Sequence, residues 1–250
     1  MNTREIQDLI DLIGSINTHP IERNVDIVFV IDASKSMEAL IQGLQQRADS
    51  LYDEFLKACA YNVKSINRIR FKVIWYQDFF IDGDDTYGES GFFEMPDERM
   101  RFNEYLNSIR ACGGSNYYRP GLAVLSSALS SDFVQEGDKR RHIIIHFTDA
   151  ASYTFEKMKN LKEKCQINND MIVKVLEDIP NGYEGFLCKW EECKYPNLDK
   201  LGKRLLLIAP EVYPWDVLEV ELDDTVRMPI NDVAKINWKR LIDVISHSVR

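Results

Sequence analysis

The sequence predicts an α/β protein whose mainly parallel sheet is covered by helices on both faces. Four short apolar runs, typical of buried strands, lie at residues 25–32, 68–76, 142–149 and 204–210. A long segment with one apolar face, residues 38–60, lies between the first two runs and predicts a crossover helix. Strands that alternate with helices of this length form parallel sheets, because a parallel pair needs such a crossover connection.

The helical segments are predicted from apolar side chains that recur every three or four residues. In the crossover segment these side chains are Leu40, Leu44, Ala48, Leu51 and Phe55, widened by Ile41, Tyr52 and Leu56. Three more segments show this pattern and are expected to be helices, namely 97–109, 121–130 and 237–249. The last of them is expected to turn one face inward, with Trp238, Leu241, Ile242 and Ile245.

We expect one domain over residues 1–250, because no Pro/Gly/Ser-rich linker, internal repeat or low-complexity tract divides the chain. Residues 1–20 are expected to contain an N-terminal helix, since helical spacing relates Ile6, Leu9, Ile10 and Ile13. Residues 151–202 lie between two predicted core strands and are longer than a simple crossover needs. We expect this inserted segment to form extra helices that pack on the sheet.

Composition and charge argue against several classes of function. The net charge of -9 and a pI near 5.1 leave no basic face for nucleic acid or for an anionic membrane surface. The first residues lack the basic start and apolar run of a signal peptide, and no segment has the roughly 20 apolar residues of a membrane span. Five scattered cysteines, an odd number, suit reduced thiols. We therefore expect a cytoplasmic protein.

Two aspartates end two of the predicted strands and indicate a single site. Asp32 ends the first strand in "VDIVFVIDASKSM", and Asp149 ends the third in "HIIIHFTD". In an open parallel sheet, ligands bind beyond the carboxyl ends of the strands. Neighbouring carboxylates repel each other and lose hydration there, so they need a cation or a reaction. Ser34 and Ser36 follow Asp32 at alternate positions, and hydroxyl oxygens together with carboxylates suit magnesium.

These residues resemble the metal-ion-dependent adhesion site of the von Willebrand factor type A (vWA) family. The first motif of the family, Asp-x-Ser-x-Ser, matches "DASKS", which contains Asp32, Ser34 and Ser36. The last motif, an aspartate in a "TDG"-like strand end, matches "FTDA" at Asp149. The middle motif is a Thr or Asp after a Gly-Gly turn. In "ACGGSNYYRPGLAVLSSAL" its place falls on Ser115 or Asn116.

The resemblance covers residues 25–150 clearly and implies a fold and a ligand set. The family fold is a Rossmann-like sheet of six strands in the order 3-2-1-4-5-6 with one antiparallel edge, and it places the strands bearing Asp32 and Asp149 side by side. The implied cofactor is Mg²⁺ or Mn²⁺, and its implied ligands are Asp32, Ser34, Ser36, Ser115 or Asn116, and Asp149. The chain departs from the family where alanine replaces the common glycines, at Ala33 and Ala150, and where the usual Thr is absent.

We expect an intracellular protein–protein interaction module rather than an enzyme. The stretch "RFKVIWYQDFF" and the Gly-Gly region resemble intracellular vWA domains, some of which act beside kinases and phosphatases, more than extracellular adhesion domains. A partner protein is expected to supply a Glu or Asp to the metal. Because the Thr of the middle motif is replaced, an alternative stays open. It is a metal-independent scaffold with a degenerate site, which docks through residues 151–202.

Two further features have a structural interpretation. His142 and His146 are four residues apart on one predicted strand, or about 13 Å, so a single metal ion cannot hold both. We interpret both as structural histidines. The acidic loop at 78–89 lacks the glycine of a calcium loop, because Tyr87 takes that position. We expect a solvated loop near the rim of the site.

The sequence contains no motif that supports an enzyme. The aspartate nucleophile of an acyl-phosphate phosphatase needs a second aspartate two residues on, where this chain has Ser34, and no Gly-x-Ser-x-Gly elbow or Gly-rich Lys loop is present. Cys188 and Cys193 have no second Cys or His pair at zinc-finger spacing. Core or rim packing is the expected role of the aromatic residues Trp190, Trp215, Tyr117 and Tyr118.

Overall fold

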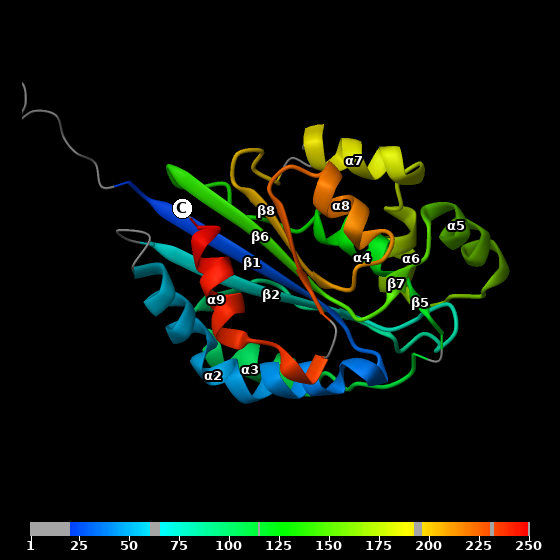
Figure 1. Cartoon of the computed structure of the whole chain (residues 1–250), viewed down its shortest axis with the longest axis horizontal. Helices are drawn as coiled ribbons and strands as arrows, with labels where there is room; N and C mark the ends of the chain where they lie inside the picture. Colours follow the sequence, from blue (N-terminus) through cyan, green and yellow to red (C-terminus); the bar gives the residue numbers. More distant parts are fainter. Residues whose placement is uncertain (1–20, 61–65, 115, 193–196, 231–232, 250) are drawn as a thin grey trace, which may run out of the picture.

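A seven-stranded, mainly parallel sheet forms the centre of the protein, with helices on both faces (Figure 1). The computed structural model describes residues 21–60, 66–114, 116–192, 197–230 and 233–249. The long strands are β1 (Arg23–Asp32), β2 (Arg68–Tyr76), β6 (Lys139–Phe147), β8 (Lys203–Ala209) and β9 (Thr225–Pro229). Two short strands pair antiparallel with β2 at one edge, β3 (Tyr87–Glu89) and β4 (Phe93–Met95).

The strand order confirms the predicted α/β, Rossmann-like fold class. The order is β3-β2-β1-β6-β8-β9, which is 3-2-1-4-5-6 when the two short edge strands count as one. The edge differs from the expected single strand because β3 and β4 pair with different parts of β2. β1 is parallel to both neighbours, with Ile31 opposite Trp75 on one side and Phe147 on the other. The carboxyl ends of β1 and β6 therefore lie side by side at the point where the strand order reverses.

Helices cover the sheet in two groups (Figure 1). On one face lie α2 (Glu38–Ala60), α3 (Arg99–Ser108) and α9 (Trp238–His247). On the other face lie α4 (Gly121–Ala128), α5 (Phe155–Lys164), α6 (Asp170–Glu177), α7 (Gly182–Glu192) and α8 (Trp215–Glu221). The remaining elements are the 3-10 turns η1 (Lys35–Met37) and η2 (Val233–Lys235) and a separate parallel pair, β5 (Tyr118–Arg119) with β7 (Ala151–Ser152).

β1 shows why the core strands are continuous apolar runs. Its side chains Ile27, Phe29 and Ile31 join the core cluster on the α2 face, whereas Val28 and Val30 join the cluster on the α4 face. Successive side chains of a strand point to opposite faces, so a strand covered on both sides is apolar at nearly every position. Fully burying one such side chain contributes about 1.5–3 kcal/mol.

The predicted helices and the described ones agree closely where the apolar pattern is strong. α3, α4 and α9 lie within the segments predicted at 97–109, 121–130 and 237–249. α9 buries Leu241, Ile242 and Ile245 as predicted, and its Trp238 is partly buried. The helix expected within residues 1–20 lies outside the described residues.

Residues 151–202 contain three helices, and these complete the core on the α4 face. Helix α5 begins after Thr154, whose side chain accepts a hydrogen bond from the Lys157 N–H, and α6 begins after Asn169 in the same way. Such caps satisfy backbone donors that the first helical turn leaves free. The helices bury apolar side chains beneath them, including Phe155, Met158, Ile172, Val175, Phe186 and Trp190. Among the described helices, none combines the length and the apolar composition needed to cross a membrane.

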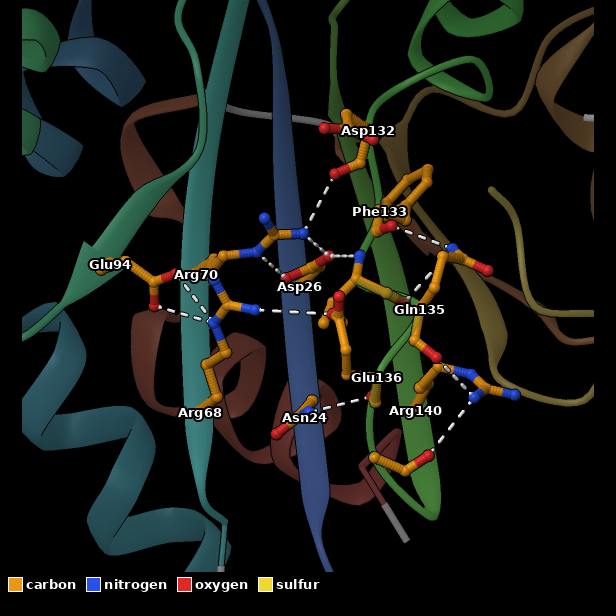
Figure 2. A network of polar contacts seen from close by, with 12 residues as sticks. Asn24, Asp26, Arg68, Arg70, Glu94, Asp132, Phe133, Gln135, Glu136 and Arg140 are labelled. Carbon is orange, nitrogen blue, oxygen red and sulfur yellow. Dashed lines mark hydrogen bonds and ion pairs between the residues drawn. The ribbon is translucent and has the colours of Figure 1, made fainter. Parts of the chain in front are cut away.

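A buried ion pair fixes the amino-terminal half of β1 (Figure 2). Asp26 is fully buried, and Arg70 on β2 donates two hydrogen bonds to its carboxylate, of 2.8 and 2.6 Å. The Val134 N–H donates to the same carboxylate at 2.6 Å, and Arg70 also donates to the Asp132 carbonyl. Forked, charge-assisted bonds of this kind are strong. They hold the loop between α4 and β6 on the sheet, about 20 Å along the strand from Asp32.

His142 joins two loops at this end of the sheet and has a structural role, as predicted. Its Nδ1 atom accepts a hydrogen bond of 2.9 Å from the Asp199 N–H, so its Nε2–H donates to the Val134 carbonyl at 3.0 Å. The ring stacks on Phe133 with a centroid distance of 4.6 Å. Burial lowers the pKa of His142, with the nearby Asp26 charge opposing. The imidazole is therefore neutral near pH 7.

Candidate metal centre

Asp32 is the last residue of β1 and anchors the candidate site. It lies beside Tyr76 on β2 and is fully buried. Its Oδ1 accepts a hydrogen bond of 3.0 Å from the Ser34 N–H, and its Oδ2 accepts one of 2.8 Å from the Thr148 hydroxyl. The carboxylate is therefore held from two sides, by the turn that follows β1 and by the turn that follows β6.

The two serines after Asp32 carry the site from the buried strand to the surface. Ser34 is buried and precedes the short helical turn η1, whereas Ser36 lies within that turn and is exposed. Their Oγ atoms are 3.2 Å apart. The Ser36 hydroxyl donates a hydrogen bond of 3.0 Å to Asp149 Oδ1. The structure thus brings together Asp32, Ser34, Ser36 and Asp149, as the spacing of the motifs predicts.

The turn that carries Asp149 is fixed from the core below it. The Ala150 N–H donates to the Thr148 hydroxyl at 3.2 Å, and the Ala150 carbonyl accepts a hydrogen bond of 2.8 Å from the Trp215 indole N–H. Trp215, the first residue of α8, is fully buried. This aromatic residue was expected only to pack in the core or at the rim. It also holds the backbone next to Asp149.

The Gly-Gly loop packs directly on the turn after β1. Gly113 and Gly114 have positive φ angles of 66° and 85°. A Cβ atom at Gly114 would lie 2.7 Å from the Ser34 Cβ. The Cys112 N–H also donates to the Ala33 carbonyl at 3.0 Å. Glycine is needed at Gly114 both for its backbone conformation and for this close approach.

The middle motif is only partly visible. Ser115 lies outside the described residues, so its side chain is not placed. The Asn116 Nδ2 donates to the Tyr153 hydroxyl at 2.6 Å, and its Oδ1 accepts a hydrogen bond of 2.8 Å from the Tyr117 N–H. Both ends of the Asn116 side chain are therefore engaged with groups other than the converging residues around Asp32.

Arg119 is the residue of the site that sequence analysis missed. It is only 3% exposed, and its guanidinium donates to the carbonyls of Gly114 and Tyr118 at 2.9 Å each, and to the Asn116 carbonyl. The Gly-Gly loop therefore folds around this side chain. Its one sequence signal is its place within the loop that follows the Gly-Gly pair.

Burial of Asp32 dominates the electrostatics of the centre. Burial raises the pKa of the Asp32 carboxyl, while the Ser34 N–H, the Thr148 hydroxyl and the Arg119 charge oppose that rise. A buried carboxylate that stays ionised needs positive charge close by. In the part of the chain that the structure describes, no cluster of three or more His, Cys, Asp or Glu side chains could hold a metal. A cation at this centre would therefore depend on the serine hydroxyls as well as on two carboxylates, a donor set that fits Mg²⁺.

Aromatic side chains form the rim of the centre beyond Asn116. Tyr117 and Tyr118 are 59% and 45% exposed, with ring centroids 5.2 Å apart, and Tyr118 stacks on the mostly buried Tyr153. The expectation of rim packing is confirmed for this pair, and core packing is confirmed for Trp190.

The acidic loop at 78–89 is not simply solvated, contrary to the expectation from its composition. Asp78 is buried and accepts a hydrogen bond of 2.8 Å from the Tyr153 hydroxyl, and Asp82 accepts one of 3.0 Å from the Gly114 N–H. Composition suggested solvent exposure, but these carboxylates accept bonds from neighbouring loops, so the loop supports the site.

Comparison with known proteins bears on the fold. No protein-family model matches the sequence, and no curated protein matches it. The pilus adhesin SpaC of Lactobacillus rhamnosus GG is similar in structure, with a TM-score of 0.51 and 11% identity over 91% of this chain and 30% of that chain. A von Willebrand factor type A structure from Catenulispora acidiphila has a TM-score of 0.39 and 13% identity, and the match covers 91% of this chain and 43% of that chain. The vWF domain of the pili tip protein Mfa5 of Porphyromonas gingivalis has a TM-score of 0.47 and 11% identity, and the match covers 92% of this chain and 95% of that chain.

At this level of identity the similarity to SpaC shows the fold alone, and this chain spans only 30% of the SpaC chain. Together with the strand order, it defines the class of the protein as an α/β domain with a Rossmann-like fold. The metal and its ligand set stay a prediction from the motifs. The structure adds a series of hydrogen bonds that connects four of the six candidate ligands, from Asp32 through Ser34 and Ser36 to Asp149.

Proposed function

We propose that the protein binds a partner protein through Mg²⁺ or Mn²⁺ held at the Asp32 centre. The observation that carries this proposal is the convergence of the buried Asp32 with the hydroxyls of Ser34 and Ser36 and the carboxylate of Asp149. Two carboxylates and two hydroxyls at the carboxyl edge of a parallel sheet offer oxygen ligands to a hard cation.

The middle ligand would come from Ser115 or Asn116. The Asn116 amide donates to the Tyr153 hydroxyl and accepts from the Tyr117 N–H, so Asn116 would have to give up these hydrogen bonds to bind an ion. A bound ion would supply an electrophilic position for an incoming oxygen ligand. The protein residues would hold that ion partly through neutral hydroxyls. Neutral ligands do not cancel the positive charge of the ion, which would therefore still attract a negatively charged ligand.

A carboxylate from the partner is the natural group to complete the centre. The protein has a net charge of -9, so long-range electrostatics oppose an acidic partner, and short-range coordination must supply the specificity. The exposed rings of Tyr117 and Tyr118 lie on the loop that follows the middle motif. Tyrosine is enriched at binding interfaces because it combines apolar area with a polar tip. We infer that a Glu or Asp of the partner approaches beside these rings.

We also propose that the protein acts inside the cell and is not an enzyme. The four described cysteines, Cys59, Cys112, Cys165 and Cys188, are free thiols, and Cys112 and Cys188 are exposed. Exposed unpaired thiols suit a reducing compartment. The resemblance to intracellular vWA domains suggests a place beside a kinase or phosphatase in a signalling system.

One observation favours a second candidate, a metal-independent scaffold with a degenerate centre. The buried guanidinium of Arg119 already places a fixed positive charge near Asp32. Such a protein would dock through residues 151–202, where Met171 and Leu201 are exposed apolar side chains, 40% and 82% exposed.

Melting temperatures with and without millimolar Mg²⁺ or Mn²⁺ separate the two candidates. An ion that binds only the folded state at 100 times its Kd stabilises that state by about 2.7 kcal/mol. We expect the ion to raise the melting temperature of wild type but not that of Asp32→Ala or the isosteric Asp32→Asn. The control is Asp85→Ala, which replaces an exposed aspartate of the acidic loop and should show the same rise in melting temperature as wild type. An equal response in wild type and both Asp32 variants contradicts the metal centre.

Partner capture extends the test to the interaction itself. Capture of the partner protein from native lysate by this protein is expected to be lost in EDTA and restored by Mg²⁺. The Ser34→Ala variant is also expected to lose this capture. If EDTA leaves capture unchanged while charge reversals within residues 151–202 abolish it, the scaffold function replaces the metal-dependent one.

A further inference from the structure

A chain of buried polar side chains lies directly beneath Asp32, on the α4 face of the sheet. It consists of Thr148, Tyr76 and His146, each 0% exposed. Tyr76 lies opposite Asp32 on β2, and His146 lies opposite Val30 on β6. Because residues two apart on a strand share a face, these side chains point into the same space below the centre.

The contacts connect His146 to Asp32. The Thr148 hydroxyl donates to Asp32 Oδ2 at 2.8 Å, and it lies close enough to the Tyr76 side chain to lower the pKa of Tyr76 against the larger upward effect of burial. The Tyr76 hydroxyl is 2.7 Å from His146 Nε2. Each member therefore contacts the next, from the core to the carboxylate.

The direction of these hydrogen bonds follows from the state of His146. Burial lowers the pKa of His146 to about 3, so the ring is neutral and carries one N–H. Its Nδ1 atom has no hydrogen-bond partner among the described residues. A buried N–H without an acceptor is unfavourable, so the proton belongs on Nε2. His146 then donates to Tyr76, and Thr148 donates to Asp32.

Packing around this chain leaves little freedom for the tyrosine hydroxyl. The His146 ring packs edge-on against the Trp215 ring, with centroids 4.7 Å apart. A Cβ atom at Gly121, the first residue of α4, would lie 2.9 Å from the Tyr76 hydroxyl and 3.0 Å from the Trp215 ring. Glycine at this position leaves room for the hydroxyl, and the neighbours hold it in place.

We propose that Tyr76 and His146 are positioning residues for the metal centre. Through Thr148 they fix the orientation of the Asp32 carboxylate, so that one edge of the carboxylate is directed at the cation. This inference rests on the proposed function, since it assigns the two residues a role in metal binding. Groups that orient a ligand in this way, without touching the metal, typically change metal affinity 10- to 100-fold when removed.

The test is a titration of the whole protein with Mn²⁺, followed by calorimetry and by the electron paramagnetic resonance signal of free Mn²⁺. We expect Tyr76→Phe and His146→Leu each to weaken binding at least about tenfold. His146→Gln, which restores an amide N–H donor, is expected to recover most of the affinity. The matched control is Tyr87→Phe, because Tyr87 is a buried tyrosine whose hydroxyl donates to Glu89 instead.

The double variant Tyr76→Phe/Thr148→Val is expected to bind Mn²⁺ about as weakly as Thr148→Val alone, because both changes interrupt one chain. Melting temperatures of the metal-free variants show that each is folded. If Tyr76→Phe and His146→Leu lower those temperatures but bind Mn²⁺ as wild type does, the positioning role is overturned and only a structural role is left. If wild type itself binds no Mn²⁺, the proposed function fails, and this inference fails with it.

Discussion

Replacing Gly114 by alanine is expected to push the Gly-Gly loop away from the Asp32 turn. Gly114 has a φ angle of 85°, and an added Cβ atom would lie 2.7 Å from the Ser34 Cβ and 2.6 Å from Arg119 Nη2. Contacts this short force a shift of the neighbours. Because Ser34 is a candidate ligand and Arg119 holds the loop, the shift changes the centre itself.

The magnitude follows from two separate effects. The left-handed backbone conformation costs about 1–2 kcal/mol for a residue other than glycine. Overpacking by the new methyl group costs about 1–3 kcal/mol more. The free energy of unfolding is therefore expected to fall by about 2–5 kcal/mol, by addition of these two ranges. For a chain of this length each kcal/mol corresponds to about 2–4 °C in melting temperature.

Gly83→Ala is the matched control for this substitution. Gly83 also has a positive φ angle, 99°, but nothing lies within 4 Å of its Cβ position. The control therefore carries the backbone effect alone, about 1–2 kcal/mol. Thermal unfolding followed by circular dichroism compares the two variants, and Mn²⁺ is then added to each. Equal losses in melting temperature, with an unchanged response to Mn²⁺ in both variants, would refute the close approach of the loop to Ser34.

Three further predictions concern the rest of the chain. Arg70→Met leaves the buried Asp26 without its charged partner and is expected to lower the free energy of unfolding by about 3–5 kcal/mol, measured by urea unfolding. The control Arg101→Met removes a partner from an exposed ion pair and should lower it less. Similar losses in the two variants would contradict the buried ion pair. Burial lowers the pKa of His142 below its usual 6.5, so as the pH falls His142 takes up a proton in the unfolded chain before it does so in the folded protein. The free energy of unfolding should therefore decrease as the pH drops below about 6.5. His142→Gln should remove part of that fall between pH 7.5 and 5.5, and an identical pH dependence would disprove the role of His142. All five cysteines should react with a thiol reagent in the denatured, unreduced protein, and fewer labelled thiols would reveal a disulfide.

The central strands were predictable because their sequence pattern is strong, and their order was implied by the resemblance to the vWA family. A strand buried on both faces, such as β1, is apolar at almost every position, and such a short continuous apolar run is easy to recognise in the sequence. The carboxyl ends of β1 and β6 follow from the pattern, and the resemblance implied that these two ends lie side by side. The motif spacing therefore predicts four candidate ligands that the structure connects by contacts.

Edge elements and loop contacts were not predictable in the same way. β9 is an edge strand whose residues are mostly partly exposed, so its sequence "TVRMP" lacks a continuous apolar run, and α8 is too short to show a helical period. Arg119 looks like an ordinary surface residue until the Gly-Gly loop folds around it. The chain from His146 to Asp32 joins residues that are distant in sequence, and only the strand register brings them together.

Anomalous diffraction from crystals of the protein soaked in Mn²⁺ would locate a bound ion directly. We expect a single strong peak beyond the carboxyl ends of β1 and β6, in contact with the hydroxyls of Ser34 and Ser36 and connected to Asp32 and Asp149 directly or through water. Crystals of Asp32→Asn should lose that peak. A peak that persists in Asp32→Asn, or no peak at this edge in wild type, would contradict the metal centre.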